Sequence, residues 1–341
     1  MREVEVQILN ELAESKKTFW ELLDKNHNTL KIFLQSLNNL YESGLVAADK
    51  EGLYLTNKGL KEVNRKSLDF KGEICSECEG KRILPAGKFK ETLTRFNEIV
   101  KERPLPTLDF FQGYMREYDV IARVALMHFY GDLADKDFIL VGDDDLLSVA
   151  LSLTDLPSRI LVLDVDERLG NFLRKINKEY GFDIEFQKYN VSDPLPSNLT
   201  GNFDVFSSEP LETLSGLKAF ICRGIACLRE DGVGYFGLTN VEASYKKWIE
   251  IEKMLTEMNC VITDIIRDFS KYPLNYETIN YEKFASKLKF PVKKNPGILW
   301  YKSSLFRFKI LGKAKLAVAA DEKLQITWVD KEEDLTYPLF Y

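Results

Sequence analysis

Carboxylate side chains follow four apolar segments of the chain, each at the point where the segment ends. Every segment has the length of a strand, and the first has the continuous apolar composition of a buried one. The acids concerned are Asp143, Asp144 and Asp145 after the first segment, Asp164 and Asp166 after the second, Asp193 after the third and Glu209 after the fourth. One such acid alone is as often a turn or helix-cap residue as a ligand. Acids at all four ends predict a polar binding site that favours a cation.

The segments that end in these acids alternate with helical patterns. We predict strands at 138–141, 159–163, 184–189, 203–206 and 232–238, helices at 117–130, 146–153, 167–180 and 213–229, and a later strand at 300–311. This alternation predicts an α/β fold with a parallel, doubly wound sheet. Ligands of such sheets bind beyond the carboxyl ends of the strands, so the acids should share one cavity.

Position along the sheet suggests individual roles for some of these acids. An acid at the end of the second strand suits the two hydroxyls of a ribose, which points to Asp164, with Asp166 next in line. Asp193, after the third strand, can accept a hydrogen bond from an adenine amino group. The chain has two histidines, His27 and His128. The second lies in an apolar helix, so chemistry based on histidine is not expected.

The order of the Gly142 loop, Asp164, Asp193 and Glu209-Pro210 resembles the class I methyltransferase framework, whose ligand is S-adenosylmethionine. Those enzymes have a GxGxG loop after the first strand, where this chain keeps only Gly142 and continues with three aspartates. The aspartates would repel the carboxylate of the methionine moiety. Decarboxylated S-adenosylmethionine lacks that group and ends in an ammonium, which an anionic loop favours.

The same order also resembles the branched-chain polyamine synthases over nearly the whole chain. The residues that carry the resemblance are Gln112-Gly113, Gly131-Asp132-Leu133, Gly142-Asp143-Asp144-Asp145, Arg223-Gly224-Ile225-Ala226 and Gly234-Tyr235-Phe236-Gly237. Where that family has Asp-Pro-Pro, this chain has Glu209-Pro210-Leu211. The stretch Ser207-Ser208-Glu209-Pro210 is in turn similar to the Ser-Ser-Asp-Pro of linear spermidine synthases.

This resemblance implies a class I methyltransferase-like Rossmann domain preceded by a winged-helix domain. It also implies an aminopropyltransferase that takes the aminopropyl group of decarboxylated S-adenosylmethionine to a polyamine nitrogen. The residues implied are Asp144, Asp145 and Glu209 for catalysis; Gly142, Asp143, Asp164, Asp166 and Asp193 for the co-substrate; and Gln112, Asp143, Glu209 and Tyr272 for the polyamine. Asp144 is favoured as the base, although the order of the three aspartates does not rank them. A methyltransferase and a winged-helix regulator remain the alternatives.

The N-terminal region has the pattern of a winged helix. Helices are predicted at 3–13, 18–23 and 28–42, and a hairpin at 45–48 and 53–55. The third helix, which would contact DNA in such a domain, carries a single basic residue, Lys31. Residues 1–70 hold ten basic and eleven acidic side chains. Phosphate contacts supply much of the affinity for DNA, so we expect no specific nucleic-acid partner.

A CxxC motif, Cys75 to Cys78, opens the segment that follows. Two thiolates at this spacing are half of a zinc ribbon, and the other half is missing from the sequence. A zinc site shared across a homodimer, a redox pair and a degenerate knuckle all stay open, and catalysis requires no metal. We expect a winged-helix domain at 1–70, a CxxC connector at 71–112 and a Rossmann-like catalytic domain at 113–341.

Composition excludes several classes of protein. The 341 residues carry a net charge of −6, and five cysteines do not make a disulfide framework. No apolar run approaches the roughly 18 residues that span a bilayer. We therefore expect a cytoplasmic protein without a membrane partner. The acidic tail, Asp330 to Asp334, and the closing residues Tyr337 to Tyr341 are candidates to cover the site.

Overall fold

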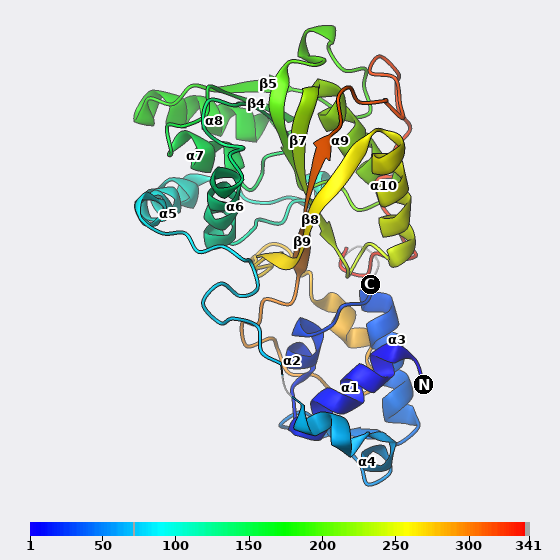
Figure 1. The fold of residues 1–341 in the computed structure, drawn as a ribbon. Helices are drawn as coiled ribbons and strands as arrows, with labels where there is room; N and C mark the ends of the chain where they lie inside the picture. The colour runs from blue at the N-terminus through cyan, green and yellow to red at the C-terminus, as the bar shows by residue number, and fades with distance from the viewer. Residues whose placement is uncertain (71, 338–341) are drawn as a thin grey trace.

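The computed structural model describes residues 1–70 and 72–337 and has two lobes (Figure 1). The smaller lobe contains the N-terminal elements, which are α1 (Glu3–Glu14), α2 (Phe19–Asp24), α3 (Leu30–Glu42), β1 (Val46–Ala48), β2 (Leu53–Leu55) and α4 (Gly59–Glu62). Threonines begin two of these helices, because the side chains of Thr18 and Thr29 accept backbone N–H groups of the first turn. The order of helices and hairpin is the expected one, and the assignment as a winged-helix domain stays a prediction.

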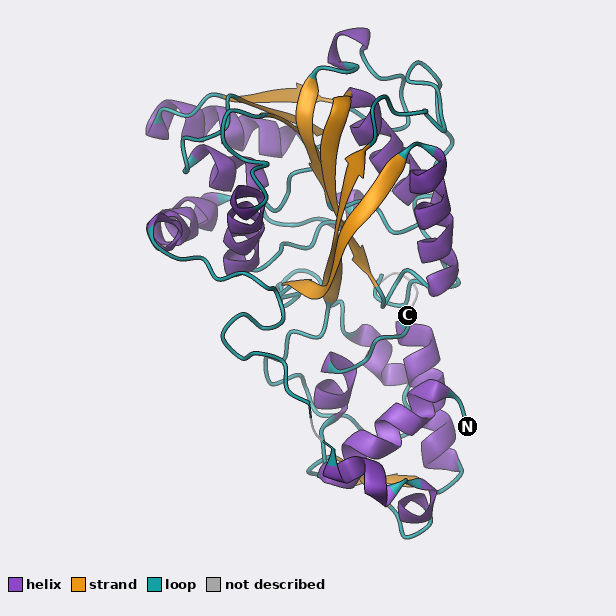
Figure 2. Cartoon of the chain, in the orientation of Figure 1, coloured by secondary structure: helices purple, strands orange, loops and turns teal. Residues whose placement is uncertain are grey.

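The larger lobe is a seven-stranded sheet with helices on both faces (Figure 2). Its strands are β3 (Asp137–Val141), β4 (Arg159–Asp164), β5 (Ile184–Lys188), β6 (Phe203–Ser208), β7 (Leu228–Thr239), β8 (Cys260–Lys271) and β9 (Lys302–Ile310). Its helices are α5 (Lys88–Ile99), α6 (Glu117–Phe129), α7 (Leu147–Ser152), α8 (Glu167–Tyr180), α9 (Leu214–Cys227) and α10 (Tyr245–Glu257). Two apolar cores, one on each face, hold the layers together.

The strand order is β5-β4-β3-β6-β7-β9-β8, with β9 antiparallel to both of its neighbours. This order confirms the α/β class and the Rossmann-like framework expected from the sequence. The order of strands reverses between β3 and β6, which is where doubly wound sheets bind ligands. The acids that follow β3 and β6 are therefore neighbours on the carboxyl edge.

Three elements of the larger lobe had no counterpart in the sequence prediction, α5, α10 and β8. β8 is one of the two edge strands, and polar residues such as Asp264, Arg267 and Asp268 interrupt its apolar character. Such a strand lacks the continuous apolar run that marks a central parallel strand. The later strand, predicted at 300–311, is β9.

A segment near the C-terminus packs into the core of the small lobe. Phe284, Phe290 and Trp300 are buried in one cluster with the apolar residues of α1, α2 and α3. Trp20 contacts the rings of both Phe284 and Trp300, and its indole nitrogen donates to the carbonyl of Lys293 at 2.8 Å. The core of the small lobe therefore includes residues from the C-terminal part of the chain. The domain boundary predicted at residue 70 stays a prediction.

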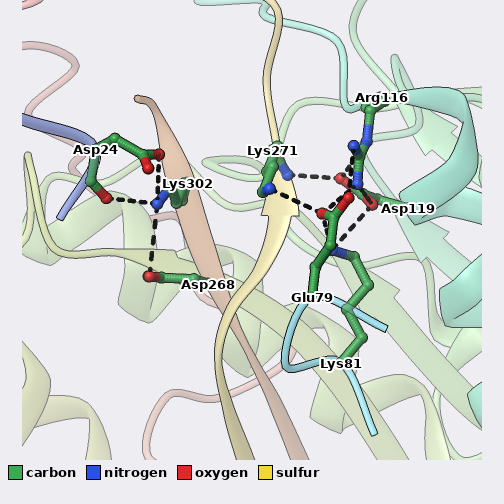
Figure 3. Close-up of polar contacts among 8 residues, drawn as sticks. All are labelled: Asp24, Glu79, Lys81, Arg116, Asp119, Asp268, Lys271 and Lys302. Atoms are coloured by element: carbon green, nitrogen blue, oxygen red, sulfur yellow. Dashed lines mark hydrogen bonds and ion pairs between the residues drawn. The ribbon is translucent and has the colours of Figure 1, made fainter. Parts of the chain in front are cut away.

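Figure 3 shows two ion-pair networks, of which the first joins the two lobes. In one, Lys302 of β9 pairs with Asp24 of α2 at 2.7 Å and with Asp268 of β8 at 3.7 Å. In the other, Glu79 of the CxxC segment accepts from Lys81, Arg116 and Lys271, and the buried Asp119 pairs with Lys81 and Arg116. The second network fixes the CxxC segment to the start of α6 and the end of β8.

The polar side of α3 contacts other parts of the chain. The Lys31 ammonium donates to the carbonyl of Glu332 at 2.9 Å. The Asn38 amide donates to the carbonyl of Lys287 and accepts the N–H of Lys289. The helix that would contact DNA in a regulator therefore has its single cation bonded to the C-terminal segment.

The part of the chain that the structure describes contains no group of three or more His, Cys, Asp or Glu residues placed to hold a metal. Cys75 and Cys78 are free thiols within the single chain, so the zinc site shared across a dimer stays a prediction. No described helix combines the length and the apolar character needed to cross a bilayer.

A substitution at Gly224 tests how tightly α9 packs on the sheet. A Cβ at this position would lie 2.2 Å from the ring of Phe206, which is fully buried on β6. Overpacking of this kind costs about 1–3 kcal/mol, more than the roughly 1 kcal/mol that alanine gains over glycine in a helix. We expect Gly224→Ala to lower the midpoint of thermal unfolding. Gly72→Ala is the control, because open space surrounds that position, and an unchanged Gly224→Ala midpoint would contradict the packing described.

Candidate active site

A cavity of about 490 Å³ opens at the carboxyl edge of the sheet. Its walls come from the loops after β3, β4, β5, β6 and β7, from the segment before α6, and from the C-terminal tail. The predicted site residues that line it are Gln112, Gly142, Asp144, Asp145, Asp164, Glu209 and Tyr272. The remaining predicted residues, Asp143, Asp166 and Asp193, are outside this lining.

The turn after β3 separates the roles of its three aspartates. Gly142 takes a positive φ of 79°, which favours glycine, and its N–H donates to the carbonyl of Leu163 at 2.8 Å. The Asp143 carboxylate turns away from the cavity into the start of α7, where it accepts from the backbone N–H and the hydroxyl of Ser148. The geometry thus gives Asp143 a structural role in the turn and does not support its predicted contacts with the co-substrate and the polyamine.

Asp144 and Asp145 both face the cavity. Asp145 is buried and accepts the backbone N–H of Met115. Burial raises the pKa of Asp145 to about 7, and the nearby Glu209 carboxylate adds to the effect. Burial also raises the pKa of Asp144 well above its ordinary value, with further contributions from Asp145 and Asp164. A cationic ligand would stabilise the ionised form of both carboxyl groups.

Glu209, after β6, has both carboxylate oxygens occupied. One oxygen is paired with the guanidinium of Arg123, a buried side chain of α6. The other accepts the hydroxyl of Tyr272 and lies 3.4 Å from the hydroxyl of Ser303. A Cβ on Gly237 would come within 2.0 Å of this carboxylate, so the glycine leaves room for it. Arg123 was missed in the sequence because it lies within an otherwise apolar helical stretch.

Asp164 lies at the end of β4, in the part of the cavity that also contains Val165, Tyr189 and Asn190. Its two oxygens accept the backbone N–H groups of Asp143 at 3.1 Å and of Asp166 at 2.8 Å. These contacts hold the carboxylate against the lining while leaving lone pairs free for another donor. The position matches the predicted contact with ribose, which stays a prediction.

Asp166 supports the site from behind. It caps α8 by accepting the N–H of Arg168, and it also accepts from the guanidinium of Arg168 and, at 3.0 Å, from the amide of Gln112. Burial opposes ionisation, but these donors lower the pKa of Asp166 below its ordinary value. The side chain positions Gln112 at the cavity instead of lining it, contrary to the predicted contact with the nucleoside.

Asp193 is exposed, and its carboxylate lies 3.8 Å from the ammonium of Lys323. The lining residues after β5 are instead Tyr189, Asn190 and Val191. The prediction placed the acid at the correct strand end, but the turn that follows directs its side chain to solvent. Asn190 is the polar residue of this loop that lines the cavity, and the adenine contact predicted for Asp193 stays a prediction.

The C-terminal tail closes one side of the cavity. Its lining residues are Trp328, Asp330, Asp334, Thr336 and Tyr337. The buried guanidinium of Arg223, on α9, holds the start of the tail by donating to the carbonyls of Ala319, Ala320 and Glu322. It also donates to the carbonyls of Val191 and Asp193 in the loop after β5. This agrees with the expectation that the tail covers the site for its residues up to 337. Residues 338–341, part of the same expectation, lie outside the described residues.

A Rossmann-like sheet with an acidic cavity at its switch point defines a transferase framework that binds a nucleoside. The family model of the branched-chain polyamine synthase A C-terminal domain matches residues 91–334. The chain belongs to the branched-chain polyamine synthase family, as the sequence resemblance predicted.

Relatives of the chain agree with this assignment. It is 41% identical over 300 residues to the N(4)-bis(aminopropyl)spermidine synthase of Thermococcus kodakarensis, covering 87% of this chain and 84% of the relative. The enzyme of the same name from Thermus thermophilus is 35% identical over 323 residues, or 94% and 90% of the two chains. The crystal structure of the Thermus branched-chain polyamine synthase, in complex with N4-aminopropylspermidine and 5'-methylthioadenosine, has a TM-score of 0.84 at 33% identity and covers 98% and 93%.

The raised pKa of Asp145 has a consequence for stability. A carboxyl group whose pKa is higher in the folded protein than in the unfolded chain binds more protons when folded, so its contribution to stability falls as pH rises. For Asp145 this loss occurs between about pH 4 and pH 7. We expect Asp145→Asn, which keeps the acceptor for Met115, to raise the unfolding midpoint at pH 8 and to have little effect at pH 4. The matched control is Asp193→Asn at the exposed position, and an equal gain at both pH values would contradict the assignment.

Proposed function

We propose that the protein transfers the aminopropyl group of decarboxylated S-adenosylmethionine to a secondary amine of a spermidine-like polyamine. The products are branched polyamines and methylthioadenosine. The observation that carries the proposal is one cavity with two unlike parts, a nucleoside part at Asp164 and Asn190 and an anionic part at Asp144, Asp145 and Glu209. The related enzymes of the same family carry the name of this activity, and the Thermus structure holds the corresponding nucleoside product.

The charges around the cavity favour the decarboxylated co-substrate. Asp145 is buried and Asp144 is half-buried, the pKa of each carboxyl group is raised, and the buried guanidinium of Arg123 is already paired with Glu209. A methionine carboxylate placed here would meet like charges in a poorly solvated site. The primary ammonium of the decarboxylated compound would instead neutralise them.

In the reaction, the nitrogen lone pair of the polyamine attacks the aminopropyl carbon that is bonded to the sulfonium. The carbon–sulfur bond breaks, and its electron pair stays on sulfur as the thioether of methylthioadenosine. The amine is a nucleophile only when neutral, so a base must first remove its proton. The site serves mainly to hold the nitrogen in line with the breaking bond.

Asp144 is the candidate base. It faces the cavity, and its raised pKa brings it closer to that of an amine, which favours proton transfer. Glu209 is less suited, since Arg123 and Tyr272 already occupy its oxygens. Asp145 and Glu209 then anchor cationic groups and align the substrate. Because neighbouring carboxyl groups titrate together, the measured pH dependence belongs to the group as a whole.

The small lobe has a structural role in this proposal. The single basic residue of α3 is bonded to the tail, and the polar side of that helix contacts residues 287–289. We expect no specific nucleic-acid partner for this reason. Assembly as a homodimer stays a prediction.

Product analysis tests the reaction. The protein is incubated with spermidine and either decarboxylated S-adenosylmethionine or S-adenosylmethionine, and the amines are identified by mass spectrometry. We expect branched aminopropyl products and methylthioadenosine with the decarboxylated compound and no transfer with the carboxylated one. Methylated amines in the second incubation would support a methyltransferase instead.

The base is tested by Asp144→Asn, which keeps the size of the side chain and removes the proton acceptor. Turnover should fall by about 10²-fold or more, the range for loss of a general base. Calorimetry should show methylthioadenosine binding unchanged, because its predicted contacts lie elsewhere. Raising the pH supplies neutral amine and should partly restore activity. The assignment is overturned if Glu209→Gln is inactive while Asp144→Asn retains nearly full turnover.

A further inference from the structure

A second, much smaller cavity adjoins the cavity of the active site at the turn after β3. Its volume is about 20 Å³, and a single water molecule needs roughly 10–15 Å³. Four residues line both cavities, namely Gly142, Asp144, Asp145 and Glu209. The proposed base and the carboxyl groups beside it therefore face the small cavity as well as the substrate.

Most of the wall of the small cavity is apolar. The apolar lining residues, all of them buried, are Met115, Val120, Leu140 and Leu147. Arg123 of α6 and Ser207 of β6 add polar groups to this wall. Side chains alternate along a strand, so Ser207 lies on the same face of β6 as Val205, which packs in the core that contains α6. The serine and the arginine are thereby brought to one cavity.

Ser207 and Arg123 each have a buried polar atom without a partner. The Ser207 side chain is 1% exposed, and its Oγ makes no hydrogen bond within the described part of the chain. Arg123 donates through Nη2 to Glu209 and, at 3.2 Å, to the hydroxyl of Ser270. Its Nε–H has no acceptor among the described residues. Native proteins leave few such atoms unless water or a ligand completes their hydrogen bonds.

The other polar residues of the small cavity have their partners within the chain. Asp143 accepts from Ser148, and the hydroxyl of Ser208 donates to the carbonyl of Val141 at 2.6 Å. A water molecule in the cavity would therefore take its hydrogen bonds from Arg123 and Ser207. Buried waters typically make about three hydrogen bonds, so it would still have protons to donate to a carboxylate.

The carboxyl groups of Asp144 and Asp145 are the acceptors that such a water would find. Asp145 receives one hydrogen bond in the chain, from the backbone N–H of Met115, and the positive charge of Arg123 acts on it. The other titratable groups close enough to influence the two carboxyl groups are Arg103, Asp143, Asp164, Glu209, Tyr114, Tyr272, Tyr276 and Tyr281.

We propose that a water molecule binds in the small cavity, held by the Nε–H of Arg123 and the hydroxyl of Ser207, and connects the carboxyl groups of Asp144 and Asp145. Arg123 and Ser207 are then positioning residues for the base. The catalytic role of this water rests on the proposed function, and it specifies where the proton of the amine goes.

The step that the water serves is a transfer of one proton, without oxidation or reduction. An N–H bond of the substrate ammonium breaks, its electron pair stays on nitrogen, and the proton binds Asp144. Asp144 passes the proton to the water, and the water passes one of its own protons to Asp145, so the water is regenerated. Asp144 is then ionised again and keeps its attraction for the cationic co-substrate. The proton leaves Asp145 for solvent when the products leave.

The test uses Ser207→Ala, which removes the hydroxyl that holds the water. Ser304→Ala is the matched control, because Ser304 is a buried serine of β9 whose hydroxyl also lacks a partner among the described residues. Ser304 lines neither of the two cavities. Turnover and KM for spermidine are measured as a function of pH. Methylthioadenosine binding and the unfolding midpoint check the nucleoside part and the fold.

We expect Ser207→Ala to move the acid limb of the kcat profile to higher pH. The water donates to the carboxylates and stabilises their ionised form, so its loss raises the pKa of the base. A shift of about one pH unit, or about tenfold in turnover on that limb, corresponds to one hydrogen bond to a charged group. Turnover at high pH, KM and the Ser304→Ala profile should match the wild type. A Ser207→Ala profile identical to that of the wild type, or one lowered equally at every pH, would overturn the proposal.

A crystal structure with methylthioadenosine checks the site directly and separates it from the proposed reaction. We expect electron density for a water within hydrogen-bond distance of Arg123 Nε and Ser207 Oγ in the wild type, and its loss in Ser207→Ala. If the wild type makes no aminopropyl product but this water is present, the reaction is wrong and the water site stands. If products form and the small cavity of the wild type contains no water, the reaction stands and this inference is wrong.

Discussion

The burial of several carboxyl groups around one cavity is the constraint on which this structure depends. Two buried cations of the described chain reach into this group, Arg123, which pairs with Glu209, and Lys247, which pairs with Asp330, and most of the other carboxyl groups lack such a partner. Removing carboxylates from water without counter-ions is unfavourable. The protein therefore needs a framework stiff enough to hold them together, and the sheet, the tail and the shared core between the lobes provide it. The ion pairs of Lys302 strengthen that framework where the lobes join, and those of Glu79 fix the CxxC segment to α6 and β8.

The sequence predicted the framework well because its signals are local. Apolar runs and the alternation of strands with helices located the five parallel strands of the sheet, and the position of each acid after a strand identified the edge on which it lies. Side-chain direction is a finer property. Asp143 and Asp193 follow strands as predicted, yet one caps the start of a helix and the other faces solvent, because the turn after the strand sets the direction.

Residues that the sequence analysis missed share a different property, which is that their neighbours are distant in the chain. Glu212 and Glu242 line the cavity from two different loops, together with Asp334 of the predicted tail, and neither glutamate belongs to a motif. Arg123 lies in a stretch that has the pattern of an apolar helix. The packing of Phe284 and Trp300 against the first helices was equally invisible, since apolar residues in a loop-rich region do not indicate which core they enter. Lys31 could be counted as a charge, but its partner in the tail could not be foreseen.

Arg223 has a consequence for how the cavity can open. Its guanidinium holds carbonyls of the loop after β5 and of the tail at the same time, and the side chain is buried. If the tail left this position, several N–H donors of the Arg223 guanidinium would remain buried without acceptors. Separation of the tail from α9 is therefore unfavourable. We therefore expect the section of the tail up to Glu322 and the loop after β5 to move together as one body. Substrate and product would then enter and leave by movement of the tail beyond Glu322, in the stretch that contains Trp328 and Asp334. The part of the tail before Glu322 would stay fixed and support that movement.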